Sequence, residues 1–234
     1  MFSLAGGAAA YSAAEALDAV RGYAFDTVAI GPGPRFPGVF ASHTVPRYAY
    51  RTYDCVPASD SARFSDLDLL VIAGLNARID MASFARLRSF ADRAADHLDA
   101  AHRMQPDFLR LHRDDVGGDP PEGSAGWHLS QAWRQGMATP GLGIARVHKV
   151  LHHKRPRLVP LLDNETVKPI RAAADARACG SWQLIHDEIH AHAEHFQALA
   201  DEFDELAADA GSVSLSWLRL YDILVWMKIM QPGR

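Results

Sequence analysis

A five-residue turn between two helical segments is the feature that most constrains how this chain can fold. The turn reads Thr139-Pro140-Gly141-Leu142-Gly143, and apolar residues recur at helical spacing on both sides of it. Proline and glycine end a helix, and two glycines that open the next one let backbone N–H groups approach a phosphate oxygen without a Cβ in the way. The sequence therefore predicts helices over roughly 127–138 and 144–153, joined by a hairpin whose turn can bind an anion.

The charge around this turn differs from the charge of the whole chain. Residues 141–171 contain seven Lys and Arg against two acids, whereas the 234-residue chain has a net charge of -4. A local cationic patch on an acidic protein is typical of a surface that binds phosphate groups. Beyond this patch, the apolar run 158–162 ends on a single acid, Asp163.

The rest of the chain is predicted to be mostly helical. Apolar residues at helical spacing indicate further helices over five ranges: 11–22, 61–77, 81–104, 181–208 and 214–230. Residues 23–60 are different, because prolines and glycines such as those of Gly31-Pro32-Gly33-Pro34 divide them into loops or a few short strands. We therefore expect a mostly α fold, with a helix-hairpin-helix module near 127–170 and a small irregular or β element at the N-terminus.

The domain organisation is predicted from a Gly- and Pro-rich stretch that begins at residue 114 and ends just before the hairpin module. Residues 1–113 are predicted to form an N-terminal helical region, 114–126 a surface loop, and 127–234 the hairpin module with the C-terminal helices. Together they are expected to form one compact unit.

Composition limits the class of protein. With 48% hydrophobic and 22% charged residues and no apolar run of about 18 residues, the sequence predicts a globular protein without a membrane span. The N-terminus has no Lys or Arg before its small apolar residues, so we expect no signal peptide. Cys55 and Cys179 could form one bridge but no disulfide framework or zinc ribbon. We expect a cytoplasmic protein without a cofactor, and the sequence does not specify its oligomeric state.

The hairpin resembles the helix-hairpin-helix motif of base-excision DNA glycosylases. That motif has a proline followed by Gly-apolar-Gly, then a helix, and then a catalytic Asp in a Val/Pro-Asp-X-X-Val setting. Here Pro140-Gly141-Leu142-Gly143 matches the turn, and Asp163 in the segment 160–167 matches the acid, twenty residues after Gly143.

This resemblance implies that the protein binds duplex DNA and hydrolyses an N-glycosidic bond. Asp163 would be the catalytic residue, orienting the attacking water and stabilising the cation-like sugar. The target base would leave the stack and enter a pocket with aromatic walls. The backbone N–H groups of the turn and the cations after it would contact DNA phosphates, which assigns DNA binding to Gly141, Gly143, Arg146, Lys149, Lys154, Arg155 and Arg157.

The chain also departs from the glycosylase pattern. Bifunctional glycosylases place a Schiff-base Lys two residues after the second glycine, where this chain has Ala145. The resemblance therefore implies a hydrolase without lyase activity. Thr139 replaces the usual leucine before the proline, and no four-cysteine cluster follows, so an iron–sulfur cluster is not expected.

A second resemblance covers most of the chain. An uncharacterised bacterial family, a domain of unknown function, has a similar Pro-Gly-X-Gly turn, a Lys-Arg-Pro-Arg-Leu-X-Pro run and a following Asp. Here those elements are Pro140–Gly143, Lys154–Pro160 and Asp163. The pairs Arg63-Phe64 and Val225-Trp226 also resemble that family.

Each of these assignments has an alternative. The turn can be a plain helix connection, and Asp163 can be the N-cap of the helix that carries Val167. The basic run can pair with the acidic helix 186–209. The alternative functions are a non-catalytic, sequence-independent DNA-binding protein, and a small-molecule enzyme or interaction protein that keeps the fold.

Histidines are concentrated in two segments. His186 and His190 are four residues apart and would share a helix face, as two metal ligands do, but no third ligand is specified by spacing. We expect solvated histidines there and no metal site. In the basic segment, the side chains of His148, His152 and His153 are expected to lie near bound phosphate.

Overall fold

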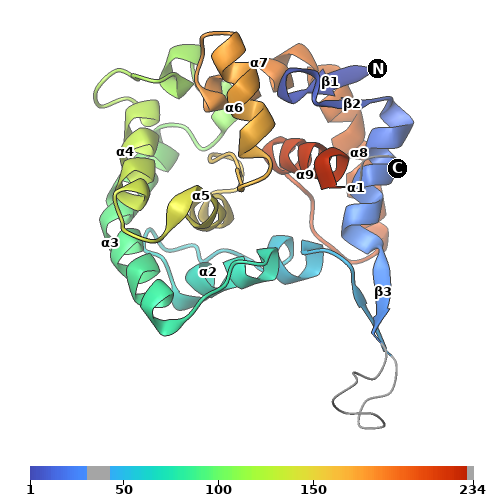
Figure 1. Cartoon of the computed structure of the whole chain (residues 1–234), viewed down its shortest axis with the longest axis horizontal. Coiled ribbons are helices and arrows are strands. Elements are labelled where there is room, and N and C mark those ends of the chain that lie inside the picture. Colours follow the sequence, from blue (N-terminus) through green and yellow to red (C-terminus); the bar gives the residue numbers. More distant parts are fainter. Residues whose placement is uncertain (31–42, 231–234) are drawn as a thin grey trace.

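The computed structural model describes residues 1–30 and 43–230, which form mainly helices with two short β-hairpins (Figure 1). The expectation of a mostly α fold with a small N-terminal β element is confirmed. The Gly31-Pro32-Gly33-Pro34 part of the predicted loop region lies outside the described residues. Within these residues, no helix has the length and apolar character needed to cross a membrane.

The N-terminal part combines both hairpins with one helix. Strand β1 (Phe2–Leu4) pairs antiparallel with β2 (Ala9–Tyr11) around the short helix η1 (Ala5–Gly7), and β3 (Thr27–Ile30) pairs with β4 (His43–Pro46). Between them, α1 (Ala13–Phe25) begins with a capping box in which Ser12 and Glu15 satisfy each other's backbone N–H groups.

The remaining elements follow in chain order and are mostly helical. Up to the hairpin they are η2 (Tyr50–Asp54), α2 (Asp66–Leu70), η3 (Val71–Leu75), α3 (Met81–Met104), η4 (Phe108–Arg110), η5 (Arg113–Val116) and α4 (Ala125–Met137). From the hairpin onward they are α5 (Gly143–Lys154), α6 (Val167–Ala176), α7 (Ser181–Ala191), α8 (Ala193–Asp209) and α9 (Trp217–Met230).

The helix expected over 181–208 is two helices that meet at His192. His192 has φ -120 and ψ 25, outside the helical region, and its ring Nε2 donates to the carbonyl of Ser3 at 3.1 Å. Phe2 of strand β1 lies beside the rings of His192 and His195. The prediction of one continuous helix was wrong because strand β1 docks at this point, which the local helical pattern does not encode.

Helix α5 lies in the middle of the molecule. In Figure 1 it has α3 and α4 on one side, α2 below it, α6 above it and α9 opposite. Gly136 lets α4 pack closely against it, since a Cβ on that glycine would lie 2.5 Å from Cγ1 of Val147. Every residue of α5 from Val147 to Lys154 is buried.

The buried polar side chains of α5 bind backbone carbonyls of neighbouring segments. The Nδ1 atoms of His148 and His152 lie 2.8 and 2.6 Å from the carbonyl oxygens of Pro160 and Val159. Because a carbonyl oxygen only accepts, both Nδ1 atoms must carry the proton. Burial lowers the pKa of these imidazoles, to about 4 for His148 and about 3 for His152. Both rings are therefore neutral, and they fix the loop that leads to residue 163.

Lys154 at the end of α5 is buried in an ion pair. Its Nζ donates to Asp68 Oδ2 at 3.1 Å and to the carbonyls of Ser59 and Arg63, both at 2.9 Å. Lys154 is 1% exposed and Asp68 0%. Burial acts to raise the pKa of Asp68, but hydrogen bonds from Ser59, Ser65 and Lys154 outweigh it, so the pKa lies below its usual range. This pair joins α5 to α2.

We expect Asp68→Ala to lower the free energy of unfolding by about 3–5 kcal/mol, because it leaves the buried Lys154 ammonium without its anion. Urea denaturation followed by circular dichroism measures this loss. Asp60→Ala is the control, since Asp60 is an exposed acid in the segment that precedes α2. An equally small effect of both substitutions would show that the Asp68–Lys154 pair does not stabilise the fold.

Candidate nucleic-acid interface

The predicted hairpin is present between α4 and α5. Gly141 and Gly143 are exposed and have φ of 80 and 67, a left-handed conformation that glycine adopts without strain. No side chain caps the N-terminus of α5, and no acid lies in its first turn. The first N–H groups of α5 are therefore available to an anion, with the positive end of the helix dipole behind them.

Four arginines surround this turn, and three of them come from distant parts of the sequence. Arg146 donates to the carbonyls of Gly141 and Arg78, at 2.8 and 2.9 Å. Arg93 donates to Thr139 Oγ1 at 2.6 Å. The guanidinium of Arg86 lies over the turn, since a Cβ on Gly141 would be 3.2 Å from its Nη1.

Arg78, Arg86 and Arg93 were not among the predicted binding residues. All three are exposed, and they come from α3 and the segment just before it. On sequence alone Arg86 and Arg93 belong to the polar face of an amphipathic helix, and nothing in their spacing points to the hairpin. Only the packing of α3 against α4 brings them there.

A cleft of about 410 Å³ opens beside the start of α5. Its walls include Gly143 and three cations, Arg78, Arg146 and Lys149, together with Asn164. Lys149 is 9% exposed, and its Nζ donates to the carbonyl of Leu75 at 2.7 Å. Burial lowers the pKa of Lys149, and Asp163 opposes that shift. Of the predicted phosphate ligands, Gly143, Arg146 and Lys149 thus line one concave surface.

The remaining predicted phosphate ligands lie elsewhere. Lys154 is in the interior, with its ammonium protons used by Asp68 and two backbone carbonyls. Arg155 is half-buried and Arg157 is exposed, and both lie at the far end of α5 from the hairpin. Arg155 and Arg157 are near the turn in sequence, but the twelve-residue helix α5 places them about 18 Å from it.

The histidines expected near phosphate are also inside the protein. His148, His152 and His153 are 1%, 1% and 5% exposed. The prediction that they neighbour a bound phosphate was wrong, because the face of α5 that carries them packs against the loop at 159–160 and against Tyr53.

Among the described residues, the basic run forms no ion pair with the acidic segment 186–209. Arg157 pairs with Asp107 at 2.7 Å. Glu188 accepts instead from the backbone N–H groups of Ala5 and Gly6, at 2.7 and 2.9 Å. The histidines of the second segment bind carbonyls: His186 and His190 lie 3.2 and 2.9 Å from those of Leu111 and Leu109.

Asp163 caps the turn that leads into α6. Its Oδ1 accepts from the backbone N–H groups of Glu165 and Thr166, both at 2.8 Å, and its own N–H donates to Thr166 Oγ1. The N-cap of α6 is Thr166, so Asp163 is not the N-cap of the helix that carries Val167; its side chain caps the turn just before that helix. Asp163 is half-buried, and its Oδ2 has no hydrogen-bond partner among the described residues.

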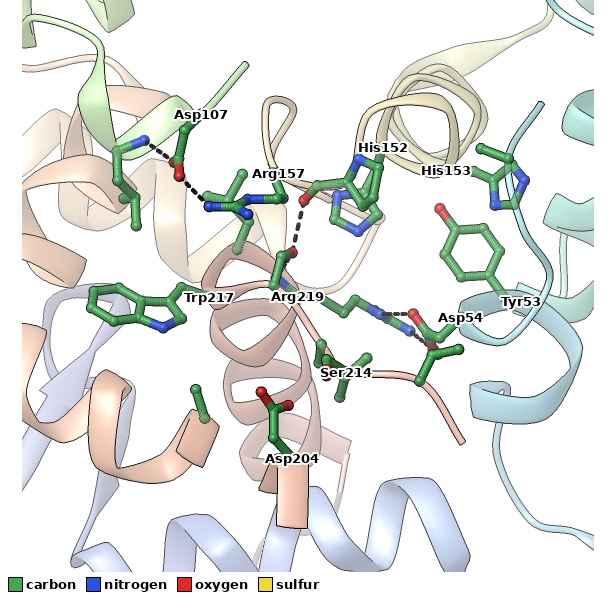
Figure 2. Close-up of a pocket in the computed structure, with 18 of the residues that line it drawn as sticks. Tyr53, Asp54, Asp107, His152, His153, Arg157, Asp204, Ser214, Trp217 and Arg219 are labelled. Carbon is green, nitrogen blue, oxygen red and sulfur yellow. Dashed lines mark hydrogen bonds and ion pairs between the residues drawn. The ribbon is translucent and has the colours of Figure 1, made fainter. Parts of the chain in front are cut away.

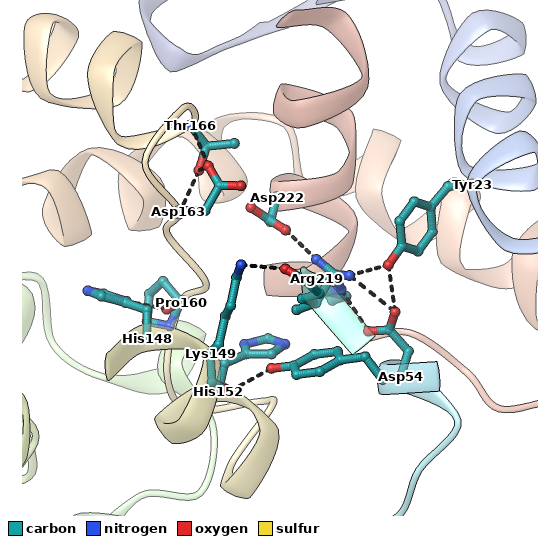
Figure 3. Close-up of polar contacts among 12 residues, drawn as sticks. Tyr23, Asp54, His148, Lys149, His152, Pro160, Asp163, Thr166, Arg219 and Asp222 are labelled. Carbon is teal, nitrogen blue, oxygen red and sulfur yellow. Dashed lines mark hydrogen bonds and ion pairs between the residues drawn. The ribbon is translucent and has the colours of Figure 1, made fainter. Parts of the chain in front are cut away.

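A buried cluster of charged residues lies next to Asp163 (Figure 3). Arg219 of α9 binds Asp222 through Nη1 and Asp54 through Nε, the latter at 2.7 Å, and Tyr23 donates to Asp54 at 2.9 Å. Arg219 and Asp222 are 3% and 4% exposed. Figure 3 places Asp222 between Asp163 and Arg219.

The carboxylates of Asp54, Asp163 and Asp222 lie near two cations, Arg219 and Lys149. Burial raises the pKa of Asp222 to about 7; Arg219 opposes the rise, and the carboxylates of Asp163 and Asp54 add to it. The Oδ1 of Asp222 is buried without a hydrogen-bond partner among the described residues. Asp222 therefore holds a proton below neutral pH.

A larger cleft of about 890 Å³ lies at the far end of α5 (Figure 2). Its polar walls include Asp54, Arg157 and Arg219, and Trp217 and Leu215 add apolar surface. Asp163 lines neither this cleft nor the one beside Gly143. A pocket with aromatic walls, which the glycosylase resemblance implies, is thus separate from the predicted catalytic acid in the part of the chain that the structure describes.

We expect Asp222→Asn to change how stability depends on pH. The pKa of Asp222 is raised from 3.8 in a free chain to about 7 in the fold, so its carboxyl destabilises the wild type progressively as the pH rises between these values. The unfolding free energy of the variant minus that of the wild type should rise from pH 4 to 7 and then level off. Urea denaturation across this range measures it, and a constant difference would mean that Asp222 is ionised throughout.

The family comparison agrees with one of the two resemblances. The sequence model of the family of unknown function DUF6308 matches residues 35–229. This agrees with the resemblance to an uncharacterised family that the run Lys154–Pro160 and the pair Val225-Trp226 indicated. No curated protein and no solved structure matches the chain. The resemblance to base-excision glycosylases has no counterpart in these findings and stays a prediction. Because this match spans most of the chain, the protein belongs to the family of unknown function DUF6308.

Proposed function

We propose that this protein binds the sugar-phosphate backbone of duplex DNA through the hairpin turn. The observation that carries the proposal is the ring of Arg78, Arg86, Arg93 and Arg146 around the uncapped start of α5. This arrangement offers backbone N–H groups and guanidinium groups on one face of a chain that is otherwise net acidic.

The chemistry of this face favours binding without a sequence preference. Backbone N–H groups and arginines around a turn recognise phosphate oxygens, which carry no sequence information. The turn presents no long side chain of its own that could reach into a groove, because its exposed positions are Pro140, Gly141 and Gly143. The binding free energy would then come mainly from released counterions, and affinity would fall steeply with salt.

Binding without base excision is the better-supported form of this proposal. One carboxylate oxygen of Asp163 accepts two backbone hydrogen bonds. Among the described residues, Asp163 lines neither the cleft beside Gly143 nor the larger one at the far end of α5. A specific observation still favours glycosylase chemistry as a second candidate. The Oδ2 of Asp163 has no hydrogen-bond partner among the described residues, and its carboxylate is near the ammonium of Lys149, which lines the cleft beside Gly143. The two groups could together act on a sugar.

We expect the double variant Arg78→Gln/Arg86→Gln to bind duplex DNA at least about tenfold more weakly at low salt, because two cations leave the phosphate-binding face. Fluorescence anisotropy with a labelled duplex at several salt concentrations measures affinity and slope. The plot of log affinity against log salt should lose about one unit of slope per phosphate contact removed.

The matched control is Arg21→Gln/Arg103→Gln. It removes the same charge from two exposed arginines that pair with Asp18 and Asp99 on their own helices. If both double variants bind DNA equally, net charge and not the hairpin face governs binding. If the wild type shows no salt-dependent binding, the proposal is wrong.

The second candidate predicts strand breaks after alkaline treatment of duplexes that carry single damaged or mismatched bases. Alkali is needed because Ala145 stands where lyase-active glycosylases have their lysine. Asp163→Asn should abolish the breaks while keeping the fold, since Asn is also a good capping residue. Breaks that persist in Asp163→Asn would exclude this residue as the catalytic acid.

A further inference from the structure

The end of α5 opposite the hairpin carries a second concave, cationic surface. A cleft of about 530 Å³ is formed there by three separate segments, 58–60, 102–110 and 154–157. It lies beyond the last turn of α5, about 18 Å along the helix from the hairpin turn. It is therefore a different surface from the proposed DNA-binding face.

Two residues in this cleft have nitrogen atoms without an acceptor. The Nε of Arg155 and the Nδ1 of His102 are buried and have no hydrogen-bond partner among the described residues. Buried N–H groups of proteins are nearly always paired, and each unpaired one destabilises the fold. A second guanidinium nitrogen of Arg155, Nη1, donates to the carbonyl of Lys154 at 2.9 Å. Both residues line the cleft, so each side chain keeps unused hydrogen-bonding capacity beside it.

The charge of the cleft is positive. Lys154 is neutralised by Asp68 behind it, and Arg157 is paired with Asp107. The guanidinium groups of Arg110 and Arg155 have no carboxylate within ion-pair distance among the described residues, and the exposed Asp60 is the remaining acid of the lining. Burial and the charge of Arg155 lower the pKa of His102, so its ring contributes a hydrogen bond rather than a further charge.

The cationic cleft continues into the larger one. Both are lined by Ala58, Asp107, Arg110, Pro156 and Arg157. Figure 2 shows the Asp107–Arg157 pair on the same side of the larger cleft as Trp217. Apolar surface from Val56, Leu109 and Leu215 accompanies that tryptophan. A charged site thus adjoins a partly apolar one that is large enough for an organic molecule.

We propose that these joined clefts bind a small phosphorylated organic molecule. Its phosphate would lie between Arg110 and Arg155, with His102 beside it, and its organic part would lie along the apolar wall near Trp217. Arginine suits this role because its planar N–H groups match the oxygens of a phosphate. A duplex backbone fits less well, because the donors are sunk in a cleft rather than carried on a projecting turn.

Isothermal titration calorimetry of the full chain tests this proposal, with inorganic phosphate, adenosine monophosphate and adenosine as probes. We expect the nucleotide to bind at least tenfold more tightly than the nucleoside, and inorganic phosphate to compete with it. Arg110→Gln and Arg155→Gln should each weaken nucleotide binding about tenfold, the usual effect of losing a hydrogen bond to a charged group.

Arg103→Gln is the control, because Arg103 is exposed on the last turn of α3, pairs with Asp99 and does not line the cleft. Chemical shifts of the His102 ring on titration with phosphate give a second measurement that does not depend on affinity. The proposal is overturned if neither anion binds the wild type, if adenosine binds as tightly as its monophosphate, or if both cleft variants bind like Arg103→Gln. DNA affinity in Arg110→Gln and Arg155→Gln should be unchanged, so the two proposals fail independently.

Discussion

The structure depends on satisfying the polar groups of a helix that lies in the interior. Helix α5 carries His148, Lys149, His152 and Lys154 into the core, where an unpaired donor is costly. Backbone carbonyls from three separate segments accept from these side chains, and Asp68 supplies the anion that pairs with Lys154. Each contact therefore fixes a loop as well as satisfying a donor. The polar helix holds its neighbours in place by hydrogen bonds with defined geometry, which apolar packing alone does not provide.

This arrangement gives the two ends of α5 different chemistry. At the start of α5, uncapped N–H groups lie beside arginines from α3 and from the segment just before α3, and together they form an exposed cationic turn. At the end, the chain turns sharply after Lys154 and places Arg155 in a cleft with unsatisfied donors. The charged cluster around Arg219 and Asp222 lies between α5 and α9 (Figure 3). The two ends of α5 thus carry the two proposed anion-binding surfaces, and the carboxyl of Asp222, whose pKa is raised to about 7, lies beside this helix.

The local structure was largely predictable, and the placement of charges was not. Turn residues and apolar periodicity predicted the hairpin and most helices, because these features depend on residues close in sequence. The number of cations after the turn predicted a phosphate-binding surface. That prediction assumed that all of these side chains face solvent. Residues 147–154 of α5 are instead all buried, and they include Lys154 and three histidines. The arginines that replace them around the turn are separated from it by fifty or so residues of sequence.

The sequence by itself determined the helical class, the turn at 139–143 and the family, since each depends on local pattern or on residue order. Tertiary structure decided which cations are free. Lys154 is neutralised because α2 brings Asp68 to it, and Arg86 reaches Gly141 because α3 packs on α4. It also decided the titration of Asp222, because burial, together with the nearby carboxylates of Asp163 and Asp54, raises its pKa to about 7. Charge and protonation depend on distances between segments that are remote in the chain, and folding alone sets those distances.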